Sequence, residues 1–168
     1  MSGSEPRARF EALCGRLRPD LFRFAYWLAR DRTVAEDVVQ DTLLRAWRSF
    51  GSLGSDTAAR PWLLTIARRE FARRFERKRF ETVDIDDLSD LEDPALAAAD
   101  AQDVMDVRAA MLKLEADYRE PLVLQVLMGY TTEEIATQLE LTPGAVLTRL
   151  FRARQKLRAI LGGTAEEL

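Results

Sequence analysis

Three polar residues at helical spacing are the first candidates for chemistry in this sequence. Asp37, Gln40 and Asp41 stand at positions i, i+3 and i+4. In an α-helix this spacing places the three side chains on one face, where they form one polar patch that can pair with basic groups of a partner. The alternative is a helix face that meets only solvent.

A run of arginine and lysine is the second candidate. Over residues 68–79, Glu70 and Glu76 are the only acidic residues among many basic ones. Such clustering favours a polyanionic partner, because basic side chains bind phosphates. An ordinary solvated helix face is again the alternative. The basic residues are Arg68, Arg69, Arg73, Arg74, Arg77, Lys78 and Arg79.

A helix-turn-helix pattern near the carboxyl end is the third candidate. Thr131 and Glu134 form a capping box that starts one helix, and Thr142 and Pro143 supply the N-cap and first turn of a second short helix. The tight turn between them carries Glu140 where a glycine is common. The second helix carries Arg149, Arg152, Arg154, Lys156 and Arg158. Such a pair can place its second helix in the major groove of DNA, although helical hairpins without this function share the pattern.

Catalytic chemistry is not indicated. The chain has no His and one Cys, which excludes an internal disulfide, the usual zinc clusters and His-based catalysis. Without a convergent set of catalytic groups, the sequence predicts a binding protein and not an enzyme, with no metal or cofactor. We interpret Cys14 as a small packed residue, with a redox switch as the alternative.

Helices must position these residues. Only 8 Gly and 6 Pro in 168 residues, with abundant Ala, Leu, Arg and Glu, predict an all-α chain. Apolar residues at steps of three and four predict a first helix over residues 7–30. Its inward stripe is Phe10, Leu13, Leu17, Leu21, Ala25 and Leu28.

Two more helices are expected before residue 80. A capping box at Thr33 and Glu36 starts a helix over residues 34–49. Its inward face is Val34, Val38, Leu43, Ala46, Trp47 and Phe50. Gly and Ser then favour a loop, and Pro61 suits the first turn of a helix that reaches about Lys78. Beyond residue 103, two amphipathic stretches follow, and Gly129 is expected to stop the second.

Charge is distributed unevenly along the chain. Residues 1–80 carry a net charge of +7, residues 81–120 carry −10, and residues 121–168 are neutral. Self-repulsion and few large apolar side chains make the acidic stretch a poor folding unit. We therefore expect two small helical domains, residues 7–79 and 103–162, joined by a flexible acidic linker, residues 80–102. With no long apolar stretch and no signal peptide, the protein is expected to be cytoplasmic, without direct membrane insertion.

Three runs of the sequence resemble the extracytoplasmic-function (ECF) sigma factors of bacterial RNA polymerase, in the family's order. Residues 35–47 (AEDVVQDTLLRAW) resemble the polymerase-binding helix of sigma domain two. Residues 61–69 (PWLLTIARR) resemble the helix after the loop that reads the minus-ten promoter element. Residues 133–136 and 144–157 resemble sigma domain four, which reads the minus-thirty-five element. The resemblance implies a transcription-initiation factor that directs core RNA polymerase to specific promoters.

The resemblance also implies the partners. The polymerase-binding residues would be Asp37, Gln40, Asp41 and Leu44. They would meet the clamp of the largest subunit, β′, while domain four meets the flap of the β subunit. An anti-sigma factor, membrane-linked in a typical case, is a further expected partner and implies control by stress or envelope signals.

The minus-ten element would be read by the loop from Phe50 to Ala59 and the helix after it. Small polar residues in the loop leave room for a flipped base, and arginines on the helix would hold phosphates. Trp62 either stacks on a base or packs in the core. The expected DNA-binding residues are Phe50, Ser52, Ser55, Thr57, Trp62, Arg68, Arg69, Arg73, Arg74 and Arg77.

The minus-thirty-five element would be read from the first turns of the last helix. The expected residues are Thr142, Ala145, Leu147, Thr148, Arg149 and Arg152. Leu147 departs from the family, which usually carries Lys or Arg at this position, and leucine cannot make the bidentate contact of arginine with guanine. Either the promoter element differs, or Leu147 contacts a thymine methyl, or it packs beside Leu150.

Two other functions fit parts of the sequence. A stand-alone helix-turn-helix regulator would bind duplex DNA without polymerase, but the patch at Asp37, Gln40 and Asp41 disfavours it. A sigma-like decoy would bind a protein partner but no promoter, and the basic run disfavours that. The acidic linker is either a tether or, by resemblance, a segment whose negative charge mimics nucleic acid in polymerase channels.

Overall fold

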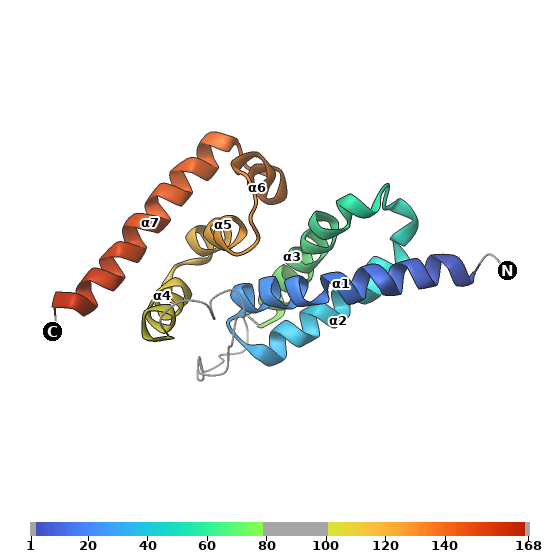
Figure 1. Cartoon of the computed structure of the whole chain (residues 1–168), viewed down its shortest axis with the longest axis horizontal. Coiled ribbons are helices and arrows are strands. Elements are labelled where there is room, and N and C mark those ends of the chain that lie inside the picture. The colour runs from blue at the N-terminus through green and yellow to red at the C-terminus, as the bar shows by residue number, and fades with distance from the viewer. Residues whose placement is uncertain (1–2, 79–100, 167–168) are drawn as a thin grey trace. The chain divides into compact units, whose positions relative to one another are not determined.

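The computed structural model describes the backbone of residues 3–78 and 101–166, and the side chains of residues 3–74 and 106–162. Within these residues every regular element is a helix, which confirms the all-α prediction (Figure 1). The chain divides into two compact units, residues 1–86 and 87–168. The acidic linker predicted over residues 80–102 lies outside the described residues, apart from Ala101 and Gln102, which begin a helix.

The first unit contains three long helices: α1 (Ser4–Ala29), α2 (Arg32–Arg48) and α3 (Ala59–Lys78). Each of the three packs against the other two, so the unit is a three-helix bundle. Fully buried side chains from all three helices fill its centre: Leu21, Phe24, Trp27, Val38, Val39 and Leu64. α1 begins three residues before the predicted start, and α3 begins two residues before Pro61.

The start of α2 differs from the prediction. Arg30 adopts a left-handed conformation (φ 57°) and reverses the chain, so that Asp31 is the next residue with extended backbone. The Asp31 carboxylate accepts a hydrogen bond from the Val34 amide at 2.9 Å and caps the helix. The predicted capping box at Thr33 and Glu36 is therefore wrong, because the chain is already helical at Thr33.

The predicted loop between α2 and α3 consists of two short 3-10 turns, η1 (Phe50–Ser52) and η2 (Asp56–Ala58). Phe50 is buried in a cluster on α1. The guanidinium of Arg9 lies over the Phe50 ring, 5.0 Å from its centroid, and its Nε donates to Asp56 at 2.8 Å. The loop is thus held against α1 at both of its turns. Apart from Phe50, the buried cluster contains Leu13, Leu53 and Ala59.

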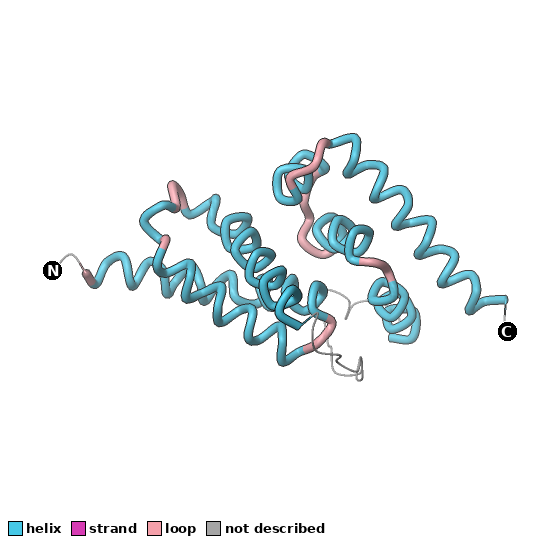
Figure 2. The backbone as a smooth tube through the Cα atoms, turned by 180° about the vertical axis from the view of Figure 1, so that it is seen from behind, coloured by secondary structure: helices cyan, strands magenta, loops and turns pink. Residues whose placement is uncertain are grey.

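The second unit contains α4 (Ala101–Lys113), α5 (Ala116–Val126), α6 (Thr132–Leu139) and α7 (Pro143–Glu166). The long helix α7 packs against the other three. Figure 2 shows that short connections link the four helices. The buried core comes from all four: Met111, Leu122, Leu124, Ile135, Val146 and Leu150. α5 ends at Val126, before Gly129, which instead supplies a positive φ of 70° in the turn to α6.

The helix-turn-helix prediction is confirmed in its main features. Thr131 and Glu134 form the expected reciprocal capping box, and the Thr142 hydroxyl accepts from the Ala145 amide at 3.1 Å at the start of α7. Glu140 takes the left-handed conformation (φ 56°) that favours glycine in such turns. One expectation was wrong: α7 is not short but spans 24 residues, because its apolar stripe continues along α4 and α5.

Candidate protein- and nucleic-acid-binding surfaces

One face of α2 carries the predicted polymerase-binding residues. Gln40 is exposed, Leu44 is 60% exposed, and the carboxylates of Asp37 and Asp41 are partly exposed. The opposite face of α2, with Ala35, Val38 and Val39 among others, is buried. The four predicted residues therefore share a surface that a protein partner could contact.

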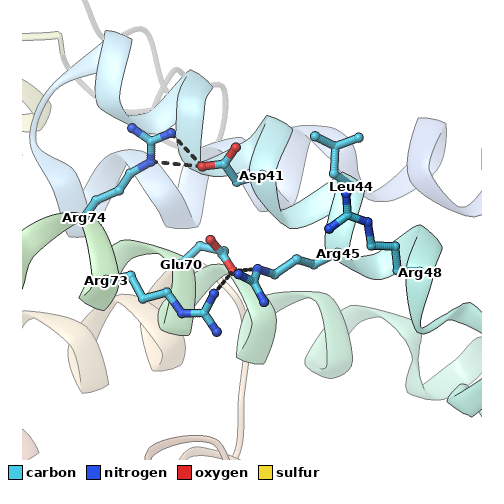
Figure 3. Close-up of a pocket in the computed structure, with 7 residues that line it drawn as sticks. All are labelled: Asp41, Leu44, Arg45, Arg48, Glu70, Arg73 and Arg74. Carbon is cyan, nitrogen blue, oxygen red and sulfur yellow. Dashed lines mark hydrogen bonds and ion pairs between the residues drawn. The ribbon is translucent and has the colours of Figure 1, made fainter.

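Both carboxylates of this surface are already engaged by an arginine from α3. Arg74 donates to Oδ2 of Asp41 from Nε at 3.2 Å and from Nη2 at 2.6 Å. Its Nη1 also lies 3.6 Å from Oδ2 of Asp37. Figure 3 shows the Arg74 side chain reaching across from α3 to Asp41 on α2. A residue predicted to bind DNA thus pairs with two residues predicted to bind protein.

A second ion cluster lies beside the first. Glu70 is buried, with 7% of its side chain exposed, and forms ion pairs with Arg45 of α2 and with Arg73, whose Nη1 lies 3.5 Å away. The two clusters line one surface cavity of about 220 Å³ (Figure 3). The lining residues are Asp41, Leu44, Arg45, Arg48, Glu70, Arg73 and Arg74. The sequence prediction missed Arg45 and Glu70, although Glu70 stood out as one of two acids in the basic run.

Trp47 corrects a prediction about the core. It was assigned to the inward face of α2 but is 44% exposed. Its ring packs on Phe10 and Phe50, with centroids 5.2 Å and 6.3 Å away, and leaves one side open. Because Leu44 precedes it by one helical turn, the two residues extend the exposed surface of α2 with apolar area.

The loop residues predicted to bind the minus-ten element divide into two kinds. Ser52, Ser55 and Thr57 are exposed. The Ser52 hydroxyl donates to the Ser49 carbonyl at 2.6 Å, and the hydroxyls of Ser55 and Thr57 lie 2.9 Å apart. These bonds shape the loop and leave lone pairs for further contacts. Phe50, by contrast, is only 6% exposed, as its place on the predicted inward face implies. Its ring supports the loop from beneath and leaves little surface for the base contact that the resemblance implies.

Trp62 and the arginines of α3 follow the loop. Trp62 is partly buried against the Phe50 cluster, with ring centroids 6.5 Å apart, as the core interpretation predicted. Arg69 is exposed, Arg68 is partly buried, and Arg73 is 47% exposed. The side chain of Arg77 lies outside the described residues. The basic surface predicted for phosphates thus contains exposed and ion-paired arginines on one helix.

The first turns of α7 present the residues predicted to read the minus-thirty-five element. Leu147 is 57% exposed, while Leu150 is buried and faces the core, so Leu147 points away from the packed stripe. Phe151, one turn beyond Leu147, is 62% exposed. The sequence prediction did not single out Phe151, although an aromatic residue between basic neighbours was a usable signal. The two side chains form an apolar strip on the exposed face of α7.

Most polar side chains at the start of α7 are exposed. Thr148 is exposed and donates to the Gly144 carbonyl at 3.0 Å, within its own helix. The Arg149 guanidinium lies 3.7 Å from the carboxylate of Asp117 on α5. This ion pair directs the Arg149 side chain toward α5. Arg152 is exposed and Ala145 is partly buried. Together with exposed Thr142, these side chains mix hydroxyl, guanidinium and apolar groups, as base-edge recognition requires.

Cys14 is partly buried on α1. Burial raises the pKa of its thiol to about 11, against a smaller lowering by the nearby charge of Arg18. The thiol is therefore protonated at neutral pH, which fits the interpretation of a packed residue better than that of a reactive one. Among the described residues there is no group of three or more potential metal ligands. No helix in those parts of the chain has the length and apolarity to span a membrane.

Comparisons with known proteins agree with this architecture. The family model for sigma-70 region 2 matches residues 13–81, and that for sigma-70 region 4 matches residues 105–157. The ECF RNA polymerase sigma factor SigL of Mycobacterium tuberculosis is 36% identical over 147 residues, which cover 84% of this chain and 82% of SigL.

Two solved structures are similar along almost the whole chain. The sigma factor RpoE of Bartonella quintana, crystallised with the anti-sigma factor NepR, has 30% identity and a TM-score of 0.76, covering 92% of this chain and 97% of RpoE. CnrH, solved with the cytosolic domain of CnrY, has 29% identity and a TM-score of 0.70, with 95% and 92% covered. With both regions in order and the three-helix bundle and helix-turn-helix in place, the chain belongs to the ECF family of RNA polymerase sigma factors, which initiate transcription and are not enzymes.

Proposed function

We propose that the two units of this sigma factor divide promoter recognition between them. Residues 7–79 bind core RNA polymerase and the minus-ten element, residues 103–162 bind the minus-thirty-five element, and residues 80–102 connect them. The observation that carries the first assignment is the shared exposed face of Asp37, Gln40, Asp41 and Leu44 on α2. A carboxylate patch beside apolar area suits a basic coiled coil such as the β′ clamp.

The DNA contacts follow from the exposed groups on the loop and α3. Ser52, Ser55 and Thr57 are small and exposed, which supports a pocket for a flipped base in this loop. Arg68, Arg69, Arg73 and Arg77 hold backbone phosphates and position the opened strand. Phe50 and Trp62 support the loop from the core, so they act on DNA only by keeping it in shape.

At the upstream element, α7 enters the major groove with its first turns. Thr142, Ala145, Thr148, Arg149 and Arg152 face the base edges and phosphates. Leu147 contacts a thymine methyl, because its exposed side chain offers only apolar surface. This contact gives the protein a preference for thymine at a position where an arginine would select guanine.

An anti-sigma factor controls this protein in our proposal. RpoE was crystallised with the anti-sigma factor NepR, and CnrH was solved with the cytosolic domain of CnrY. The surfaces of α2 and α7 are the faces that such a partner would have to cover to block polymerase and DNA. We place the protein in the cytoplasm, where core polymerase is found.

Affinity for core RNA polymerase tests the docking surface. The double variant Asp37→Ala, Gln40→Ala removes one charge and two hydrogen-bonding groups from the exposed face of α2, so we expect at least a tenfold loss of affinity, about 1.4 kcal/mol. Glu11→Ala is the matched control, since it removes an exposed carboxylate from α1. Equal affinities of the double variant and the wild type, measured by fluorescence anisotropy, would refute the assignment.

A further inference from the structure

Arg74 connects the surface proposed to bind DNA with the surface proposed to bind polymerase. It belongs to the basic run of α3, but its guanidinium lies against Asp37 and Asp41 on the docking face of α2. No other arginine with described contacts bridges these two carboxylates. The Arg74 guanidinium therefore occupies the position beside these carboxylates where a basic side chain of a partner would bind.

The energetics of this contact allow competition. The side chains of Arg74, Asp37 and Asp41 are 29%, 47% and 38% exposed. Ion pairs with this much solvent contact are weak and are screened by salt. An arginine or lysine of a partner can therefore displace Arg74 at a small cost in free energy. It must displace Arg74 to form ion pairs with both carboxylates.

We propose that Arg74 is a positioning residue that competes with core polymerase for Asp37 and Asp41. This inference rests on the proposed docking role of the α2 face. In the free protein the guanidinium holds both carboxylates in place and offsets one of their two negative charges. Docking of a basic coiled coil displaces it, and the freed guanidinium then faces solvent beside Arg73, where it can take a phosphate of the promoter strand.

This exchange couples the two binding events. Polymerase binding removes the internal partner of Arg74 and so favours its contact with DNA, and DNA binding by Arg74 frees the carboxylates for polymerase. Linkage requires the two effects to be equal in binding free energy. The neighbouring arginine does not share this role, because Arg73 pairs with buried Glu70, which is not on the docking face.

The test measures affinity for core polymerase in the full-length protein with Arg74→Gln. Removing the competitor frees both carboxylates, so we expect affinity to rise by about two- to fivefold, the size of a partly exposed ion pair. Arg74→Lys keeps the charge and should stay near the wild type. Arg16→Gln, an equal charge change at an exposed position of α1, controls for long-range electrostatics and should leave affinity unchanged.

A merely structural role of Arg74 predicts no gain in affinity for polymerase. If the guanidinium only supported the packing of α2 on α3, Arg74→Gln would bind polymerase equally or more weakly, and the proposal would be overturned. Thermal unfolding of each variant shows whether the fold is kept. If Asp37→Ala, Gln40→Ala also left affinity unchanged, the docking face itself would be refuted. If only the Arg74 result failed, the docking face would stand and the competition alone would fall.

Discussion

At the scale of single residues, the contacts of an arginine in this protein depend on which carboxylate lies within reach. Arg73 and Arg74 are adjacent in sequence, yet one pairs with buried Glu70 and the other with the exposed Asp37 and Asp41. The sequence predicted a basic surface correctly but treated its members as equivalent. Contacts between helices distant in sequence separate them, and helical spacing within α3 carries no information about those contacts.

Leu147 gives the sharpest prediction about specificity. Leu147→Arg places a bidentate donor at an exposed position of α7, so we expect a gain of about 1–3 kcal/mol for promoters with guanine at the contacted base pair. The measurement is competitive binding of the polymerase complex to a library randomised in the minus-thirty-five element. Leu147→Met keeps the apolar contact and should keep the wild-type preference. An unchanged ranking of sequences for Leu147→Arg would show that this side chain does not reach a base.

At the scale of elements, helix types and most boundaries were predictable and the caps only in part. The capping box at Thr131 and the N-cap at Thr142 were predicted correctly, because each directly follows a turn. At α2 the same pattern at Thr33 was misleading, since a left-handed residue at Arg30 starts the helix earlier. Backbone reversal at a non-glycine residue leaves no clear signal in a sequence.

The cap of α2 can be tested by two parallel substitutions. Asp31→Ala removes the carboxylate that accepts from the Val34 amide, so we expect the free energy of unfolding to fall by about 1 kcal/mol. Thr33→Ala lies within the helix, where alanine has the higher helix propensity, and should leave stability unchanged or raise it by up to about 0.5 kcal/mol. Urea denaturation followed by circular dichroism measures both. A larger loss for Thr33→Ala than for Asp31→Ala would mean that the capping box forms in solution.

The loop between α2 and α3 shows where prediction from sequence reached its limit. Its serine and threonine side chains are exposed. The sequence pattern placed both Phe50 and Trp47 on the inward face of α2, but only Phe50 is buried, whereas Trp47 is 44% exposed. Both aromatic residues follow the same helical stripe, and η1 turns the chain just where the stripe ends. The stripe predicted the burial of Phe50 correctly but not the exposure of Trp47, whose ring lies beside those of Phe10 and Phe50.

At the scale of the whole molecule, the uneven charge of the chain indicated its organisation. The acidic stretch after residue 80 separates the basic run of α3 from the helix-turn-helix, and the chain divides into two units within that stretch. We propose that each unit carries its own binding face: α2 with α3 in the first, and α7 in the second. In our proposal polymerase and promoter contacts are distributed over both units, so we expect initiation to require both.

Run-off transcription tests the central claim most directly. Purified core RNA polymerase is incubated with a fragmented genomic library of the host, with and without this protein, and the transcripts are sequenced. We expect discrete new transcripts that depend on the protein and are lost with Asp37→Ala, Gln40→Ala but kept with Glu11→Ala. Binding to polymerase without any new transcript would contradict promoter-directed initiation and indicate a decoy, and the absence of any binding to polymerase would contradict the account as a whole.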